Sequence, residues 1–219
     1  MHQPLRNLLT KTNFCVVGNS PKEIGKKQGA LIDSFDIVVR FKNYITEDYE
    51  EDYGSKTDVW ATPFNLTQFY REPDQYRAVL CSLPLNTSKW KKIYSPSNID
   101  YQLMNRYNGI VEFIPVDLFE ECKTYYGSGQ ASTGINILYW IYKLIGPINK
   151  KQIFGFSMFD PHEDHHYFLS KELNPKTNPQ KDPRRQQIQR GWFGCTPHTH
   201  PRQFEKKVFD LITLDEEKC

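Results

Sequence analysis

Residues 14–43 read FCVVGNSPKEIGKKQGALIDSFDIVVRFKN, and two short apolar runs, at 14–17 and 37–41, flank a polar turn. Both runs are nearly continuous rather than alternating, which is typical of strands buried on both faces of a helix-covered sheet. Gly18 follows the first run directly, and its lack of a side chain allows a tight turn and a close backbone approach to a ligand. Open α/β sheets place their ligands at such turns, beyond the carboxyl ends of strands. The stretch therefore predicts a buried strand that leads into a ligand-binding turn.

Segments of the same kind recur along the chain. Further strands are expected at 58–61, 78–81, 111–116 and 153–156, because each segment is short and rich in Val, Ile, Phe or Trp. Helices are expected at 98–107, 133–144 and 201–212, the second with Ser132 as its N-cap and Gly146-Pro147 as its stop. Strands that alternate with helices predict an α/β fold. We expect a single Rossmann-like domain over residues 1–219, with a twisted, mostly parallel sheet flanked by helices.

Composition narrows the class of protein. The 219 residues suit one domain, and 38% hydrophobic residues give a globular rather than a disordered chain. A formal net charge of +2 implies no strong field for nucleic acid, so no nucleic-acid partner is expected. No run reaches the ~18 apolar residues of a membrane span. The five cysteines are scattered and form no CxxC pair, which favours free thiols in a reducing compartment.

One long region, about 160–197, has no hydrophobic periodicity, and such a stretch is usually an active-site lid or disordered. Basic residues gather within it at 171–190. They have two interpretations, a solvated loop or a lid that closes over an anionic substrate. We expect a mobile lid at about 170–197.

The segment ASTGINIL, 131–138, places Ser132, Thr133 and Gly134 at the start of an expected helix. Hydroxyls and free N–H groups at a helix start cap the helix and also bind anions. These two roles are compatible, because one hydroxyl can cap while another contacts a ligand.

Five of the six histidines lie between His162 and His200. Three interpretations stay open for them: metal ligands, catalytic bases, or ordinary surface residues. Their spacing matches no structural zinc pattern, and the cysteines do not join them. A histidine beside a carboxylate acts instead as a general base. If Pro201 starts a helix, Glu205 lies one turn beyond His200 and could orient its ring.

Together, these segments resemble the animal-type sialyltransferase family with its four ordered motifs. The long motif is similar to residues 15–43 followed by YGSKTD, the short motif to 132–156, the third to 166–168, and the very short one to His200 with Glu205. The long-motif positions at family spacing are Gly18, Asn19, Gly29, Ile32, Asp33, Asp36, Val38, Arg40, Gly54, Lys56 and Thr57. All four motifs occur in family order over roughly residues 14–212. The resemblance implies a GT-A-like variant of the Rossmann-like fold.

The resemblance also implies an inverting, metal-independent glycosyltransferase that needs no cofactor. It would move sialic acid, or a related acidic sugar, from a CMP-sugar donor to a hydroxyl of an oligosaccharide or glycolipid acceptor. His200 would deprotonate that hydroxyl, with Glu205 beside it, and His166 would stabilise the departing phosphate. The donor-binding residues would be Gly18, Asn19, Ser20, Lys42, Asn43, Ser132, Thr133, Gly134, Gly155, Phe156 and Tyr167. A CMP-Kdo-type transferase and a histidine-metal hydrolase are the alternatives.

The sequence departs from the family at several positions. Lys42 stands where the family has asparagine and Asn43 comes one place late, so either the strand end shifts or Lys42 contacts the donor. The usual partner of Cys15 is missing, Leu169 replaces an acidic residue, and no membrane anchor or stem is found. These losses suggest a compact bacterial or viral member. We expect it in the cytoplasm, with peripheral association at a bacterial inner membrane through a lipid-linked acceptor; the alternative is a Golgi-type luminal domain without its anchor.

Overall fold

The computed structural model describes residues 3–64, 71–84, 101–127, 131–158 and 201–215 of the chain. Its first half alternates short helices and strands: α1 (Gln3–Thr10), β1 (Phe14–Val17), η1 (Pro21–Glu23), α2 (Gly29–Asp33), β2 (Ile37–Phe41), α3 (Glu50–Tyr53), β3 (Val59–Thr62), η2 (Pro73–Gln75) and β4 (Ala78–Cys81). The second half contains α4 (Tyr101–Arg106), β5 (Val111–Phe113), α5 (Val116–Thr124), α6 (Thr133–Ile145), β6 (Ile148–Asn149), η5 (Lys150–Gln152), β7 (Ile153–Phe154), α8 (Arg202–Ile212) and β8 (Thr213–Leu214).

Six strands form one sheet in the order β5-β4-β3-β2-β1-β7, and every neighbouring pair in it is parallel. Along the chain, the strands of this sheet are added from β1 toward β5 at one edge, and β7 then pairs with the other side of β1. The strand order therefore reverses between β1 and β7, and ligands of open α/β sheets bind at such a reversal. A second, two-stranded sheet pairs β6 with β8. The predicted mostly parallel α/β sheet flanked by helices is confirmed.

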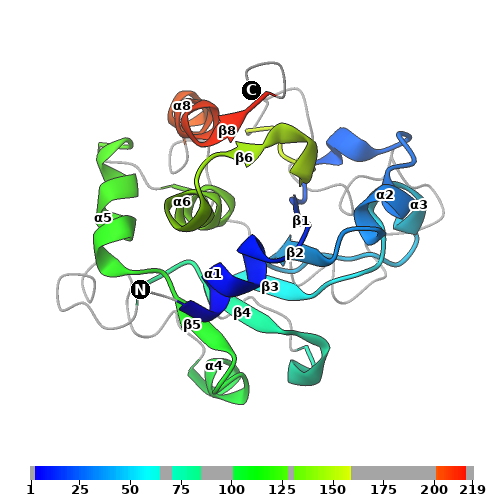
Figure 1. Ribbon diagram of the computed structural model, residues 1–219, viewed down its shortest axis with the longest axis horizontal. Coiled ribbons are helices and arrows are strands. Elements are labelled where there is room, and N and C mark those ends of the chain that lie inside the picture. Colours follow the sequence, from blue (N-terminus) through cyan, green and yellow to red (C-terminus); the bar gives the residue numbers. More distant parts are fainter. Residues whose placement is uncertain (1–2, 65–70, 85–100, 128–130, 159–200, 216–219) are drawn as a thin grey trace, which may run out of the picture.

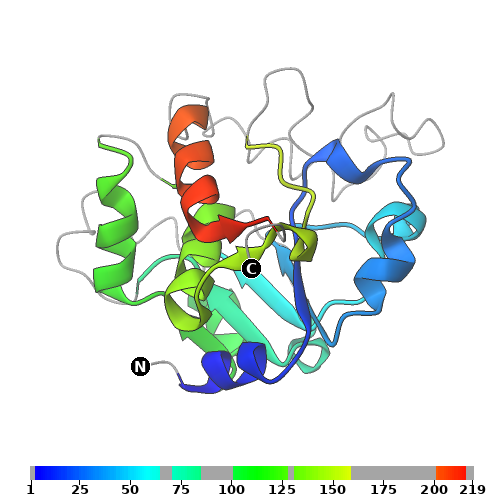
Figure 2. The same ribbon diagram turned by 45° about the horizontal axis from the view of Figure 1, so that its top comes forward.

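Helices cover both faces of the six-stranded sheet. Val16, Val39 and Ala61 belong to the core on the face of α1, α5, α6 and α8. Val17 and Val38, alternating with them along the strands, belong to a second core with residues of α2 and α3. Figures 1 and 2 show α2 and α3 grouped apart from α5, α6 and α8. Burial on both faces explains why the strands of the sequence are apolar runs rather than alternating ones.

Several predicted boundaries move by a few residues. β5 ends at Phe113 rather than at 116, because Pro115 is the N-cap of α5. β7 ends at Phe154 rather than at 156, because Gly155 turns the backbone into the left-handed region with φ 65°. The main helix, α6, begins at Thr133 after the N-cap Ser132, as predicted, and ends at Ile145, one residue beyond the predicted 144, with Gly146 as its C-cap. The expected helix at 98–107 is observed as Tyr101–Arg106, and α5 was not predicted.

No helix among the described residues has the length and apolar character needed to cross a membrane. The predicted lid at about 170–197 lies outside the described residues. The single domain over 1–219 stays a prediction.

Candidate functional site

The turns that follow β1 and β7 interlock where the strand order reverses. The Gly18 amide donates to the Phe154 carbonyl oxygen at 2.8 Å, and the Ser20 amide donates to that of Gly155 at 3.0 Å. A Cβ atom on Gly18 would lie 2.3 Å from the Gly155 carbonyl oxygen, so neither turn could keep this distance with a larger residue. The predicted residues Gly18, Ser20 and Gly155 therefore lie together at the carboxyl edge of the sheet.

Two buried polar side chains, those of Glu23 and Tyr53, hold these turns in place through hydrogen bonds. The Glu23 carboxyl oxygen Oε1 accepts a hydrogen bond from the Gly155 amide at 3.0 Å, and its other oxygen pairs with Lys26 at 3.3 Å. The Tyr53 hydroxyl donates to the Ser20 carbonyl oxygen and accepts from the Glu23 amide. Sequence reasoning missed both residues. In the sequence, the only sign of Glu23 is that a charged residue follows the Gly18 turn closely, and charged residues near turns are also common on protein surfaces.

Phe156 joins these turns to the start of α6. Its ring would be 2.8 Å from a Cβ atom on Gly134, and it also contacts the Gly18 position. The ring packs edge-on against Phe41 with centroids 5.6 Å apart, and it stacks on Phe209 of α8 at 6.4 Å. Phe156 is thus a packing centre for β2, α6 and α8. Its predicted contact with a donor stays a prediction.

The N-terminus of α6 is held by one acidic residue of α8. Ser132 caps α6, because its Oγ accepts a hydrogen bond from the Ile135 amide at 3.2 Å. The Ser132 amide donates to Glu205 Oε1, and the Ser132 hydroxyl donates to Oε2, each at 2.7 Å. The first-turn amides of Thr133 and Gly134 have no carbonyl partner within the helix, as at every helix start, and can bind an anion.

Glu205 is 1% exposed, and this burial raises the pKa of its carboxyl group to about 7. The two hydrogen bonds from Ser132 lower the pKa, as do the nearby Tyr126 hydroxyl and the positive charge of Lys42, but burial dominates. Within the described residues, the Tyr126 hydroxyl is buried without good hydrogen-bond geometry to any group. Both carboxyl oxygens of Glu205 are engaged by Ser132. Its predicted role in orienting His200 stays a prediction.

The polar residues after β2 adjoin the first turn. The Asn19 side-chain amide donates to the Phe41 carbonyl oxygen at 3.1 Å. Lys42 follows with a left-handed backbone, φ 50°, and Asn43 is buried. The pairing of β2 with β3 is regular through Phe41, and the Lys42 amide continues it by donating to the Ala61 carbonyl oxygen. The regular pairing gives no sign of a shifted strand end, and a contact of Lys42 with the donor stays a prediction.

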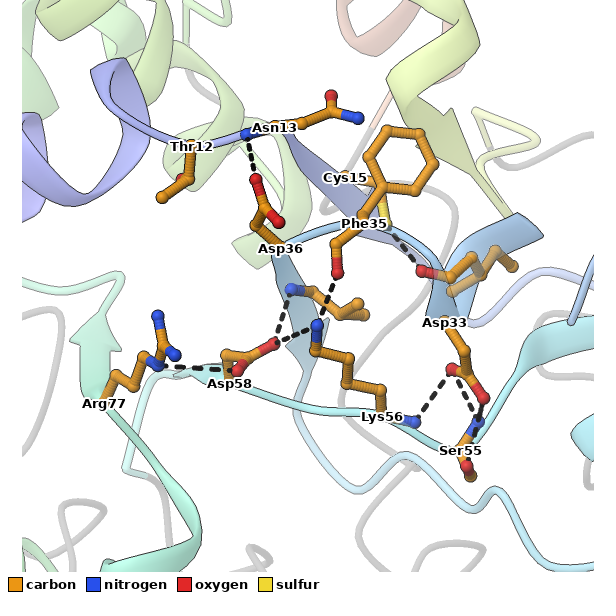
Figure 3. A network of polar contacts seen from close by, with 12 residues as sticks. Thr12, Asn13, Cys15, Asp33, Phe35, Asp36, Ser55, Lys56, Asp58 and Arg77 are labelled. Carbon is orange, nitrogen blue, oxygen red and sulfur yellow. Dashed lines mark hydrogen bonds and ion pairs between the residues drawn. The ribbon is translucent and has the colours of Figure 1, made fainter. Parts of the chain in front are cut away.

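Several residues of the long motif lie instead at the amino edge of the sheet (Figure 3). The Asp33 carboxylate accepts hydrogen bonds from the Ser55 amide and hydroxyl and from the Lys56 amide. The Asp58 carboxylate accepts from the Val38 amide at 2.9 Å. These hydrogen bonds fix the loop residues that lead into β2 and β3. Their function in this chain is structural.

His166, Tyr167 and His200 lie outside the described residues, together with the rest of the histidine cluster. Among the residues that are described, no three His, Cys, Asp or Glu side chains gather as metal ligands would. Cys15, Cys81 and Cys122 are buried and free.

Fold and site together define a Rossmann-like α/β protein with a candidate ligand site at the reversal of its strand order. Residues 7–84 match the family model of glycosyltransferase family 29 (sialyltransferase). The chain is 27% identical over 140 residues to an alpha-N-acetylgalactosaminide alpha-2,6-sialyltransferase 2 of Mus musculus. That alignment covers 62% of this chain and 36% of the relative. Both matches are to sialyltransferases, and the chain spans about a third of the length of the curated relative.

Solved structures agree on the fold. A mammalian sialyltransferase in complex with Gal-beta-1-3GalNAc-ortho-nitrophenol superposes with a TM-score of 0.58 at 20% identity, covering 94% of this chain and 67% of that one. A second mammalian sialyltransferase structure gives 0.56 at 19% identity, covering 91% and 65%. At this identity the likeness concerns the fold alone.

Proposed function

We propose that this chain transfers sialic acid, or a related acidic sugar, from a CMP-activated donor to a hydroxyl group of a glycan acceptor. The observation that carries the proposal is the meeting of three segments, Gly18–Ser20, Ser132–Gly134 and Gly155–Phe156, at the reversal of the strand order. Open α/β sheets bind nucleotides at this place. The match of residues 7–84 to the sialyltransferase family supports the same activity.

The chemistry suits the residues that the chain offers. A cytidine monophosphate is a good leaving group, so the anomeric carbon develops positive charge early, whereas a sugar hydroxyl is a poor nucleophile at neutral pH. His200 would act as the general base for the acceptor hydroxyl, a contribution typically worth ~10²–10⁴-fold in rate. His166 would stabilise the departing phosphate, an electrostatic role that a metal ion fills elsewhere. Attack from the opposite face inverts the anomeric centre, and we propose that no metal takes part.

The donor would lie over the interlocked turns. Its phosphate or carboxylate would contact the free amides at the start of α6, where the helix dipole also favours negative charge. Glu205 would keep that start in place through Ser132. The acceptor would be an oligosaccharide or a glycolipid. A cytoplasmic enzyme that reaches a lipid-linked acceptor from the membrane surface is the arrangement we propose, and the buried free thiols are consistent with it.

A thermal-shift screen against CMP, CDP, UDP, GDP and NAD, each with and without EDTA, tests the proposal. A ligand at ~100 times its dissociation constant stabilises a protein by roughly 2.7 kcal/mol, which is readily measured. We expect CMP to stabilise the protein with or without EDTA. No response to either cytidine nucleotide, with destabilisation by EDTA, would support a histidine-metal hydrolase instead.

If CMP binds, transfer assays with CMP-sialic acid and CMP-Kdo then identify the donor. Replacing His200 with Ala should abolish transfer while CMP still binds. Normal turnover of that variant would contradict the proposed base.

A further inference from the structure

The acidic residue that follows the turn after β1 is buried, whereas glutamate is normally solvated. Glu23 is 7% exposed, and its two carboxyl oxygens have different partners. Oε1 accepts a hydrogen bond from the Gly155 amide at 3.0 Å, and Oε2 pairs with the exposed Lys26 at 3.3 Å. Glu23 and Gly155 are 132 positions apart in the chain. A contact between the turns after β1 and β7 therefore accounts for the burial of this carboxyl group.

The peptide group between Phe154 and Gly155 is hydrogen-bonded on both sides. Its carbonyl oxygen accepts from the Gly18 amide at 2.8 Å, and its N–H group donates to Glu23 at 3.0 Å. A Cβ atom on Gly155 would lie 2.5 Å from the Gly18 carbonyl oxygen, so the two turns are already in close contact. Glu23 thus supplies the acceptor that fixes the direction of the Gly155 amide.

Loss of the Glu23 carboxyl group would disturb more than one hydrogen bond. An amide that is buried without an acceptor is unfavourable, so the Gly155 amide would turn toward another acceptor or toward water. A glycine backbone permits such a rotation. Because a peptide group is planar, the Phe154 carbonyl oxygen would turn with the amide and leave the Gly18 amide. The contact between the two turns depends in this way on Glu23.

We infer that Glu23 is a positioning residue for the proposed transfer, because its carboxyl group holds the turn after β7 against the turn after β1, over which the donor would lie. The Tyr53 hydroxyl supports this arrangement, since it accepts from the Glu23 amide at 3.3 Å and donates to the Ser20 carbonyl oxygen. The inference rests on the proposed function. It adds a residue that acts on the donor through the backbone of Gly155.

The test compares CMP affinity with stability in variants of the full chain, by isothermal titration calorimetry and urea denaturation. Glu23→Leu keeps the bulk of the side chain but removes the acceptor of the Gly155 amide, whereas Glu23→Gln keeps an acceptor oxygen. Asp52→Ala is the matched control. Asp52 holds the same loop by accepting from the amides of Gly25 at 2.8 Å and Lys27 at 2.9 Å, and these two hydrogen bonds do not involve the turn after β7.

We expect Glu23→Leu to weaken CMP binding about tenfold or more, the usual effect of leaving a buried amide without its acceptor. Glu23→Gln should bind CMP nearly as tightly as the wild type. Asp52→Ala should lower the free energy of unfolding and leave CMP affinity unchanged. If Glu23→Leu does not fold, Tyr53→Phe, which removes only the supporting hydroxyl, should weaken CMP binding in its place.

Wild-type affinity of a folded Glu23→Leu, or of Tyr53→Phe where Glu23→Leu does not fold, would overturn the inference. An equal loss of affinity in Asp52→Ala would also overturn it, because the stability of the loop alone would then control binding. Glu23→Gln as weak as Glu23→Leu would exclude the hydrogen bond to Gly155 as the cause. A wild-type chain that does not bind CMP would instead overturn the proposed function itself.

Discussion

The Glu205 carboxyl group accepts two hydrogen bonds from Ser132, one from its amide and one from its hydroxyl, each at 2.7 Å. The two residues are 73 positions apart, and the contact joins the first turn of α8 to the N-cap of α6. Because the carboxyl group is buried, it cannot exchange these bonds for water. The contact therefore fixes where the start of α6, the candidate anion site, lies relative to α8.

Removing this carboxyl group should destabilise the protein more than neutralising it. Glu205→Ala leaves the buried amide and hydroxyl of Ser132 without a partner, at a cost of about 1–3 kcal/mol in addition to the lost packing. Glu205→Gln keeps one acceptor for the amide and offers a donor to the hydroxyl. Urea denaturation of both variants measures the difference in the free energy of unfolding. Equal losses would contradict the importance of the two hydrogen bonds.

Glu205 should also make stability depend on pH. Its pKa is raised from about 4.5 in the unfolded chain to about 7 in the folded protein. Between pH 4.5 and pH 7, the carboxyl group is therefore protonated in the folded protein but ionised in the unfolded chain. The contribution to stability is therefore fully present below pH 4.5 and is lost as the pH rises through about 7. The loss is roughly 3 kcal/mol at 1.36 kcal/mol per pH unit.

Thermal unfolding from pH 4.5 to 8 checks this expectation, with Glu205→Gln as the control. The Gln side chain does not titrate, so its melting temperature should decline less over this range than that of the wild type. Parallel curves for the two proteins would show that Glu205 does not titrate as expected.

The fold follows from the sequence because each strand is a short apolar run that ends at a Gly, a polar residue or a turn. The stretch FCVVGN specifies β1 and its turn by itself, since Gly18 is where the strand must end. The N-cap Ser132 is likewise a local feature, and local features can be read from sequence. α5 was missed because Val116 continues an apolar run, and only the tertiary structure separates that run into a strand and a helix.

The site was predicted in part, for a physical reason. Local patterns singled out Gly18, Ser132 and Glu205, and the resemblance added Gly155. The pairing of Glu205 with Ser132, however, depends on the position of α8, which no local pattern determines. Glu23 was missed because a charged residue in a turn is normally solvated. Only the close approach of the β7 turn explains its burial, through the bond from the Gly155 amide.

At the opposite edge of the sheet, Asp33 should matter more to stability than Asp36. Asp33 accepts from two backbone amides and a hydroxyl. The exposed Asp36 accepts, within the described part of the chain, from the Asn13 amide alone at 2.9 Å. Asp33→Asn exchanges one acceptor oxygen for a donor and should cost about 1–2 kcal/mol in the free energy of unfolding. Asp36→Asn should cost about 0.5 kcal/mol or less. Chemical denaturation of both variants measures the two values, and the reverse order would contradict the structural role of Asp33.

Replacing Gly18 with Ala should lower the free energy of unfolding more than replacing Gly134 with Ala. A Cβ atom on Gly18 would lie 2.3 Å from the backbone oxygen of Gly155, which hydrogen bonds to Ser20 and Glu23 hold in place. A Cβ atom on Gly134 would meet the ring edge of Phe156 at 2.8 Å, and a side chain can move where a backbone cannot. Gly18→Ala should therefore cost about 3 kcal/mol or more and should also weaken CMP binding, because the interlocked turns must separate.

Gly134→Ala should cost about 1 kcal/mol or less, because the higher helix propensity of alanine offsets part of the strain on the ring. Melting temperatures and CMP titrations of the two variants, measured side by side, check both expectations. If Gly18→Ala were as stable as Gly134→Ala and bound CMP normally, the turns after β1 and β7 would not need their close contact. The donor would then have to be held by other parts of the sheet edge.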